Sequence, residues 1–147
     1  FGNASTPDVP VADQSLSDVI STWPQGLTEI RLGDYMFRPH QRWTVTAVPD
    51  KGGYLGAPYY KITIEGTSRA LAATADCELV SVPEYTGAPE QLWRIEQLID
   101  GTFRIVSEKV PGKEGEQFAL VCTGDATLTL GRFDFNNVNC KWNFRDR

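Results

Sequence analysis

One pattern of eight residues, with a tryptophan at its third position, occurs three times in the chain at intervals of about 50 residues. The copies occupy residues 41–48, 91–98 and 140–147 and contain Trp43, Trp93 and Trp142. A short apolar segment, a turn residue and an aromatic residue precede each copy in the same order. Self-similarity at a fixed period is the signature of repeated structural units. The sequence therefore predicts three repeats, at about residues 1–48, 49–98 and 99–147.

Within the repeats, apolar residues follow the period of β-strands. Tyr60, Ile62 and Ile64 alternate with polar residues, as they do in a half-buried strand. Asp100 and Gly101 form a D-G pair between two such segments, which is a strong hairpin signal. A four-stranded unit cannot bury its apolar face alone, whereas three units can share one core. We therefore expect an all-β domain with four strands per repeat and the three repeated tryptophans in its core.

The Q-x-W motif is intact at residues 41–43 and 91–93, and Cys140 replaces the glutamine in the third repeat. This triplicated pattern resembles the ricin B-like β-trefoil superfamily, which includes fungal lectins and the mushroom β-trefoil peptidase inhibitors. The resemblance implies a single β-trefoil domain over residues 1–147, with a six-stranded barrel and a cap of three hairpins around a pseudo-threefold axis. It also implies that each motif glutamine ties the backbone of its own repeat together.

The start of the chain fits this pattern least well. Counting back from Trp43 by the spacing of the other repeats places the first strand within residues 6–12, where only Val9 and Val11 alternate. Either this is a poor first strand, or the true strand ended near Phe1 and its beginning is missing. We favour the second interpretation.

Composition and charge exclude several classes of function. The chain has 147 residues with 19 acidic and 14 basic side chains, and its net charge is −5 at pH 7. This balance argues against a nucleic-acid partner and against docking on anionic membranes, because both need a clustered positive surface. No apolar run reaches the roughly 18 residues that can span a bilayer, so we expect no membrane insertion. The compartment, cytoplasmic or secreted, and the oligomeric state stay open.

Three cysteines, Cys77, Cys122 and Cys140, cannot all pair within the chain. None has the spacing of a zinc site or of a C-x-x-C motif. We interpret them as small buried apolar residues, with a Cys122–Cys140 disulfide as the alternative.

The chain lacks the residue patterns of common catalytic and metal sites. His40 is the single histidine, which excludes histidine-rich metal sites. The carboxylates are scattered over turns, so no acid–base pair of the glycosidase type is evident. No cysteine has an evident basic neighbour that would favour its thiolate. We therefore expect no catalytic residue, no metal and no cofactor.

Carbohydrate binding is the function that the resemblance favours. A ricin-type subsite is a shallow pocket in which an acid accepts from sugar hydroxyls, an aromatic ring packs on the apolar sugar face, and a polar residue beside Q-x-W completes the contacts. Asp18, Tyr35, His40 and Gln41 stand at comparable positions in the first repeat. We predict the carbohydrate-binding site there, with a glycan or glycoprotein as the partner.

The other two repeats depart from this pattern. The second repeat keeps Tyr85 but has Arg69 where an acid is expected. The third repeat offers Glu116, Phe133 and Asn139 in an altered register. No repeat carries the full pattern, so we expect at most one or two competent subsites.

Inhibition of a serine or cysteine peptidase is the alternative function, because residues 69–80, 90–95 and 100–105 also resemble the mushroom inhibitors. A rigid barrel can hold a loop extended in a protease cleft, which lowers the entropy cost of binding. Residues 108–116 form the most prominent predicted loop, with Lys109 and Lys113 as candidate trypsin-directed side chains. A trefoil that binds proteins through other surfaces is the third hypothesis.

Overall fold

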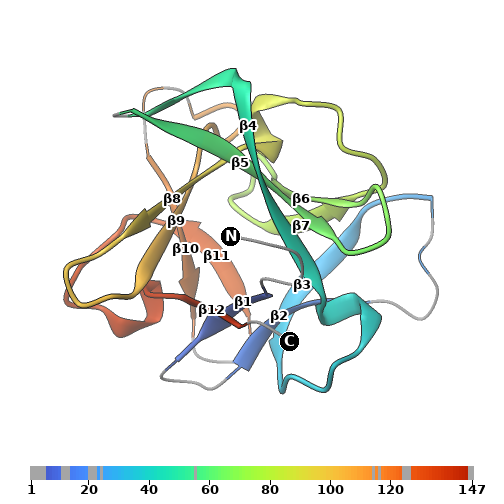
Figure 1. Ribbon diagram of the computed structural model, residues 1–147, viewed down its shortest axis with the longest axis horizontal. Helices are drawn as coiled ribbons and strands as arrows, with labels where there is room; N and C mark the ends of the chain where they lie inside the picture. Colours follow the sequence, from blue (N-terminus) through green and yellow to red (C-terminus); the bar gives the residue numbers. More distant parts are fainter. Residues whose placement is uncertain are drawn as a thin grey trace.

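The computed structural model describes residues 6–10, 14–19, 23, 25–54, 56–113, 115, 117–123 and 127–145, and these residues form three similar units around one axis (Figure 1). The first unit contains β1 (Thr6–Val9), β2 (Gln14–Asp18), β3 (Thr28–Gly33), the 3-10 turn η1 (Pro39–Gln41) and β4 (Trp43–Tyr54). The second contains β5 (Ala57–Ile64), β6 (Ala70–Ala73), β7 (Leu79–Val82), η2 (Pro89–Gln91) and β8 (Trp93–Gln97). The third contains β9 (Phe103–Ser107), β10 (Ala119–Cys122), β11 (Leu128–Gly131), η3 (Val138–Cys140) and β12 (Asn143–Arg145). The described part of the chain has no helix with the length and apolarity that crossing a membrane requires.

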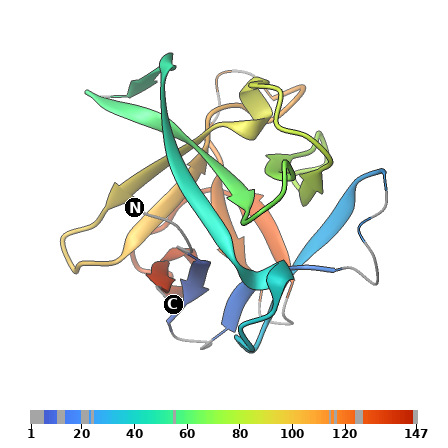
Figure 2. The same cartoon turned by 45° about the vertical axis from the view of Figure 1, so that its right-hand side comes forward.

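The strand pairing is that of a β-trefoil, as the sequence predicted. The barrel strands pair antiparallel as β4–β5, β5–β8, β8–β9 and β1–β12, and Phe103 and Trp142 form a bridge between β9 and the residue before β12. The hairpins β2–β3, β6–β7 and β10–β11 form the cap. The tip of the β4–β5 hairpin projects beyond the barrel (Figure 2). The expected all-β trefoil is therefore confirmed.

The three tryptophans of the repeated pattern are fully buried. Each indole Nε1 donates to the carbonyl of a leucine in the second strand of its own unit, at 3.0 or 3.1 Å, and the pairs are Trp43 with Leu16, Trp93 with Leu71 and Trp142 with Leu120. Each ring supplies roughly 200 Å² of apolar surface to the core and has one N–H group that needs a partner. These three bonds define which positions are equivalent among the units.

The glutamines of the intact Q-x-W motifs hold the segments that precede them. The Gln41 amide donates to the carbonyl of Asp34 at 2.7 Å and accepts from the backbone N–H of Met36 at 2.7 Å. The Gln91 carbonyl accepts from the backbone N–H of Thr86 at 2.8 Å. In the third unit, where a cysteine replaces the glutamine, no equivalent side-chain bond is present among the described residues.

The structure has a strand, β1, within the predicted residues 6–12. This strand fits the alternative interpretation, a first strand with a weak sequence pattern. It has four residues and contains Pro7, which has no N–H to donate. Thr6 and Val9 are nonetheless fully buried, and β1 pairs with both β2 and β12. Burial of β1 between β2 and β12 therefore compensates for its weak strand sequence.

All three cysteines are free thiols. Cys122 and Cys140 are buried apolar residues, as expected, and they form no disulfide with each other. Cys77 is half-buried in the β6–β7 turn, with a φ of 60° that non-glycine residues seldom adopt.

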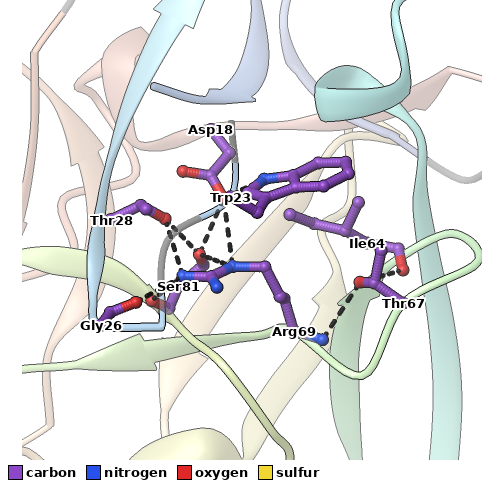
Figure 3. Close-up of polar contacts among 8 residues, drawn as sticks. All are labelled: Asp18, Trp23, Gly26, Thr28, Ile64, Thr67, Arg69 and Ser81. Atoms are coloured by element: carbon purple, nitrogen blue, oxygen red, sulfur yellow. Dashed lines mark hydrogen bonds and ion pairs between the residues drawn. The ribbon is translucent and has the colours of Figure 1, made fainter. Parts of the chain in front are cut away.

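A buried ionic network joins the first and second units (Figure 3). Asp18, at the end of β2, is 1% exposed, and its Oδ2 accepts from Ser81 Oγ at 2.7 Å and from Trp23 Nε1 at 3.2 Å. Arg69 Nε lies 3.8 Å from the same oxygen. Arg69 Nη2 also donates to the carbonyl of Gly26 at 2.8 Å. The carboxylate and the guanidinium thus neutralise each other away from water, where an unpaired charge is costly.

We predict that Trp93→Phe lowers the free energy of unfolding by about 2 kcal/mol, because the buried carbonyl of Leu71 loses its donor and the smaller ring leaves a void. Urea unfolding followed by far-ultraviolet circular dichroism measures the change. Phe135→Leu is the control: Phe135 is 40% exposed and lies outside the repeated pattern, so the change should cost less. Equal costs for the two variants would contradict the role of the repeated indoles.

We also predict that Asp18→Asn costs about 3 kcal/mol, because Arg69 loses its carboxylate partner while it stays buried. Glu29→Gln provides the comparison, since it breaks an ion pair with Arg31 in which both side chains are about half exposed. Such exposed pairs contribute at most about 1 kcal/mol. Urea unfolding of both variants tests this, and a similar loss in each would show that the network in Figure 3 does not stabilise the fold.

Candidate functional site

The structure divides the four residues predicted as the first-repeat site into two buried and two half-buried side chains. Asp18 and Gln41 lie below the surface, and the contacts described above engage Asp18 Oδ2 and both ends of the Gln41 amide. Tyr35 and His40 are half-buried on the segment between β3 and β4. The first unit therefore presents a ring and an imidazole near its surface, while the acid faces the Arg69 network. The binding role of these four residues stays a prediction.

An exposed apolar tip lies next to these residues. Met36 and Phe37 are 61% and 60% exposed, and the ring of Tyr35 packs on that of Phe37 with their centroids 4.7 Å apart. Phe37 has a φ of 59°, in the left-handed region that bulky residues seldom occupy. The bond from the Met36 N–H to Gln41 holds the backbone immediately before this strained residue. Gln41 thus fixes the shape of the tip.

The surroundings of His40 favour its neutral form. Burial lowers the pKa of His40 below its ordinary value of 6.5; the charge of Asp18 opposes this change and that of Arg38 adds to it. A neutral imidazole can both donate and accept a hydrogen bond. In the described part of the chain, no three His, Cys, Asp or Glu side chains gather in a way that could hold a metal ion.

A cation above an aromatic ring recurs in the second and third units. Lys61 Nζ lies 4.8 Å from the ring centroid of Tyr85, and the guanidinium of Arg104 lies 5.1 Å from that of Phe133. The two cations hold equivalent positions, because the residue before each pairs with the tryptophan of its own unit. Tyr85 and Phe133, predicted from the sequence as counterparts of Tyr35, therefore lie under basic side chains.

The third unit contains a depression of about 420 Å³ between β9, β10 and the segment after β11. It is lined by Arg104, Val106, Gly115, Gln117, Phe118, Ala119, Arg132 and Phe133. The β9–β10 connection spans residues 108–118, whereas the equivalent connections span residues 10–13 and 65–69. The longer connection supplies one wall of the depression, which explains why this unit differs from the others.

The lining combines a rigid floor, two aromatic rings and three polar side chains. Val106 and Ala119 are buried and pair across β9 and β10, so the floor is fixed by the sheet. Phe118 and Phe133 are half-buried. The three polar side chains, those of Arg104, Gln117 and Arg132, can all donate hydrogen bonds. The depression can therefore contact both apolar and oxygen-rich parts of a ligand.

Arg104 is fixed in place by Glu96 on β8. Arg104 Nε lies 2.5 Å from Glu96 Oε1, and the same oxygen accepts from Arg94 Nη2 at 3.1 Å. Burial alone would raise the pKa of Glu96, but the hydrogen bonds from Arg94 and Arg104 outweigh it and lower that pKa. Glu96 is therefore ionised at neutral pH and holds one edge of the Arg104 guanidinium.

Lys109 and Lys113, the candidates of the inhibitor hypothesis, lie on a connection that folds back on the barrel. Both residues are half-buried. The Lys109 carbonyl accepts from Ser107 Oγ at 3.1 Å, and the Lys113 N–H donates to the carbonyl of Val110 at 3.0 Å. Val110 itself is 1% exposed within the core. Residues 108–113 are thus turned and anchored rather than extended, and the inhibitory role of the two lysines stays a prediction.

Sequence reasoning named Phe133 as a candidate but missed Arg104, Gln117 and Arg132. Glu116, the acid predicted for this repeat, lies outside the described residues. Two signals could have identified the depression. The segment after the first strand is longer in the third repeat than in the others. The first strands of the second and third repeats also have a basic residue at the same position, Lys61 and Arg104.

Solved structures of low sequence identity share this fold. The designed threefold-symmetric protein ThreeFoil is 18% identical, with 97% of this chain and 98% of that chain covered and a TM-score of 0.77. SeviL bound to asialo-GM1 saccharide is 14% identical, with 99% and 98% covered and a TM-score of 0.69. A mosquitocidal holotoxin is 14% identical over all of this chain and 18% of its own, with a TM-score of 0.78. At these identities the likeness shows the fold alone, and no curated protein matches the chain in sequence.

The sequence itself also matches a family model. The model of the ricin-type β-trefoil lectin domain-like proteins matches residues 39–113, from η1 to the β9–β10 connection. This segment is slightly more than half of the chain and includes both intact Q-x-W motifs. The chain therefore belongs to the family of ricin-type β-trefoil lectin domain-like proteins.

Proposed function

We propose that this protein binds carbohydrate, without catalysing a reaction, through the depression of the third unit. One observation carries the proposal: aromatic rings and hydrogen-bonding side chains line a single surface depression of about 420 Å³. That volume lies in the range of small-molecule sites, roughly 300–1,000 Å³. Membership of a lectin-like family and a structural neighbour bound to asialo-GM1 saccharide support the proposal.

The two kinds of surface on a sugar match the two kinds of group in the depression. The ring of Phe133 can pack on the apolar C–H face of a pyranose. Arg104 and Gln117 can donate to hydroxyl oxygens, and the Gln117 carbonyl can accept from a hydroxyl. Paired strands form the floor and Glu96 holds Arg104, so little ordering is needed when a ligand binds.

The described lining gives no basis for glycoside hydrolysis. Hydrolysis by a glycosidase needs two carboxyl groups across the bond, one of them with a raised pKa. Among the described residues that line the depression, none is a carboxylate. Glu96, which lies behind Arg104, has a lowered pKa and is held by two guanidinium groups. Binding without catalysis is therefore the activity that we propose.

Peptidase inhibition through Lys109 and Lys113 is the weaker proposal, because their connection is anchored by Val110 and is not extended. Full activity of trypsin and papain in a stoichiometric excess of this protein would exclude it. Binding of proteins through another surface has no specific observation in its favour.

We predict that a glycan array identifies at least one bound glycan and that Phe133→Ala weakens its binding about tenfold, or about 1.4 kcal/mol. Phe135→Ala is the matched control, because Phe135 is exposed two residues later, under Lys141 and outside the depression. Isothermal titration calorimetry measures both affinities. No binding at about 100 μM protein would contradict the proposed function, and an equal loss in both variants would contradict the site.

The single histidine distinguishes the two candidate sites. A ligand in the third-unit depression should leave the pH titration of His40 unchanged, whereas a ligand on Tyr35 and His40 should shift its pKa. Nuclear magnetic resonance of the imidazole signals, with and without the bound glycan, measures this. In the free protein we expect a midpoint below 6.5 that rises in Arg38→Gln, because a positive charge is removed. A glycan-induced shift would move the proposed site to the first unit.

A further inference from the structure

Two guanidinium groups line the third-unit depression on a protein whose net charge is −5. Arg104 comes from β9, and Arg132 directly follows β11. Strands β9 and β11 both pair with β10, so the two arginines approach the depression from opposite sides of one strand. A neutral sugar requires only hydrogen-bonding groups, whereas this lining places two permanent positive charges beside an aromatic ring.

Arg104 is pre-organised, and part of its guanidinium is available to a ligand. Its Nε bonds to Glu96 and its plane lies over Phe133, while its side chain remains 30% exposed. No hydrogen bond to another described residue uses its two terminal nitrogens. Because one edge is fixed and the other is exposed, the group can accept an oxyanion with little loss of side-chain freedom.

The described side chains that line the depression or contact Arg104 through Glu96 are mainly basic. Arg94 and Arg104 share one carboxylate oxygen of Glu96. Arg132 is exposed, and it forms no ion pair with a described residue. Among Arg94, Arg104, Arg132 and Glu96, three guanidinium groups therefore accompany one carboxylate.

We infer that the depression selects saccharides that carry an anionic substituent, either a carboxylate or a sulfate. Arg132 and the terminal nitrogens of Arg104 bind the oxygens of this substituent, and the sugar ring packs on Phe133. A guanidinium fork matches such oxyanions with two parallel hydrogen bonds, which are stronger than bonds between neutral groups. This inference rests on the proposed function, since it specifies the class of sugar that the same depression binds.

The test compares neutral and acidic forms of the same glycans. An array presents each backbone unmodified, sialylated, glucuronylated and sulfated, so the carboxylate and sulfate forms are distinguished directly. For the bound backbone, we expect the acidic form to bind at least about tenfold more tightly than the neutral form. Arg132→Gln should reduce this preference about tenfold, because it lowers the affinity for the acidic form much more than the affinity for the neutral form. Raising NaCl from about 0.15 M to about 0.5 M should also reduce the preference.

Two further variants make the result specific to the depression. Arg104→Gln should reduce the preference as well, although it also releases Glu96, so its urea midpoint is measured alongside. Arg38→Gln removes an exposed positive charge in the first unit and should leave the preference unchanged. Equal binding of acidic and neutral forms overturns this inference and leaves the proposed function standing. Binding of no glycan of either kind overturns both, and a preference that survives Arg132→Gln overturns the assignment of Arg132.

Discussion

The structure depends on three indole N–H groups, each bonded to a leucine carbonyl inside the core. Each tryptophan stands at the start of the fourth strand of its unit or directly before it, and each leucine stands in the second, so every bond joins the barrel to the cap. Both partners are buried, and a buried donor or acceptor without a partner costs about 1–3 kcal/mol. The distance between these two strands is therefore fixed in each unit. The connections between the strands carry no such constraint.

The units consequently differ in the lengths of their connections. The first unit lengthens the segment between its second and third strands, residues 19–27, and that segment brings Trp23 and Gly26 onto the network of Asp18 and Arg69. The third unit lengthens residues 108–118, which creates a wall of the depression. One extension thus serves the junction between two units, and the other forms a surface that can receive a ligand.

The fold could be predicted from the sequence because its main determinants are periodic. The tryptophan spacing and the two-residue alternation of apolar side chains are both local patterns, and they indicate the repeats and the strands directly. The first strand was harder, because four residues that include a proline carry little pattern. Its burial depends on contacts with β12 at the other end of the chain.

The candidate site was harder to predict than the fold. The direction of its side chains and the pairing of its charges depend on contacts between units, and the repeated sequence pattern carries no information about these contacts. Asp18 follows the fully buried Leu16 by two residues, and alternation places both on the same face of β2. The sequence therefore contained a signal that Asp18 is buried. Its partner Arg69, however, reaches Asp18 because β3 of the first unit pairs with β7 of the second. Arg69 stands where the second repeat was expected to supply an acid, so the departure from the family pattern provides the counter-ion of the first repeat. The depression in turn depends on the β9–β10 connection, which is longer than its counterparts in the other units. A comparison that looks for similarity among the repeats does not reveal such a difference.

The negative net charge of the protein and the basic side chains of the depression act on a ligand over different distances. At about 0.15 M salt, interactions between exposed charges fall off over roughly 8 Å, so a small anionic group is influenced mainly by its immediate neighbours. A long polyanion would extend beyond the third-unit depression, and the protein as a whole has a net charge of −5. The composition therefore argues against nucleic acid as a partner, yet it is compatible with a single carboxylate or sulfate on a short saccharide. The size of the depression and its two arginines thus favour, for the site proposed above, a short saccharide with one anionic group over a long polyanion.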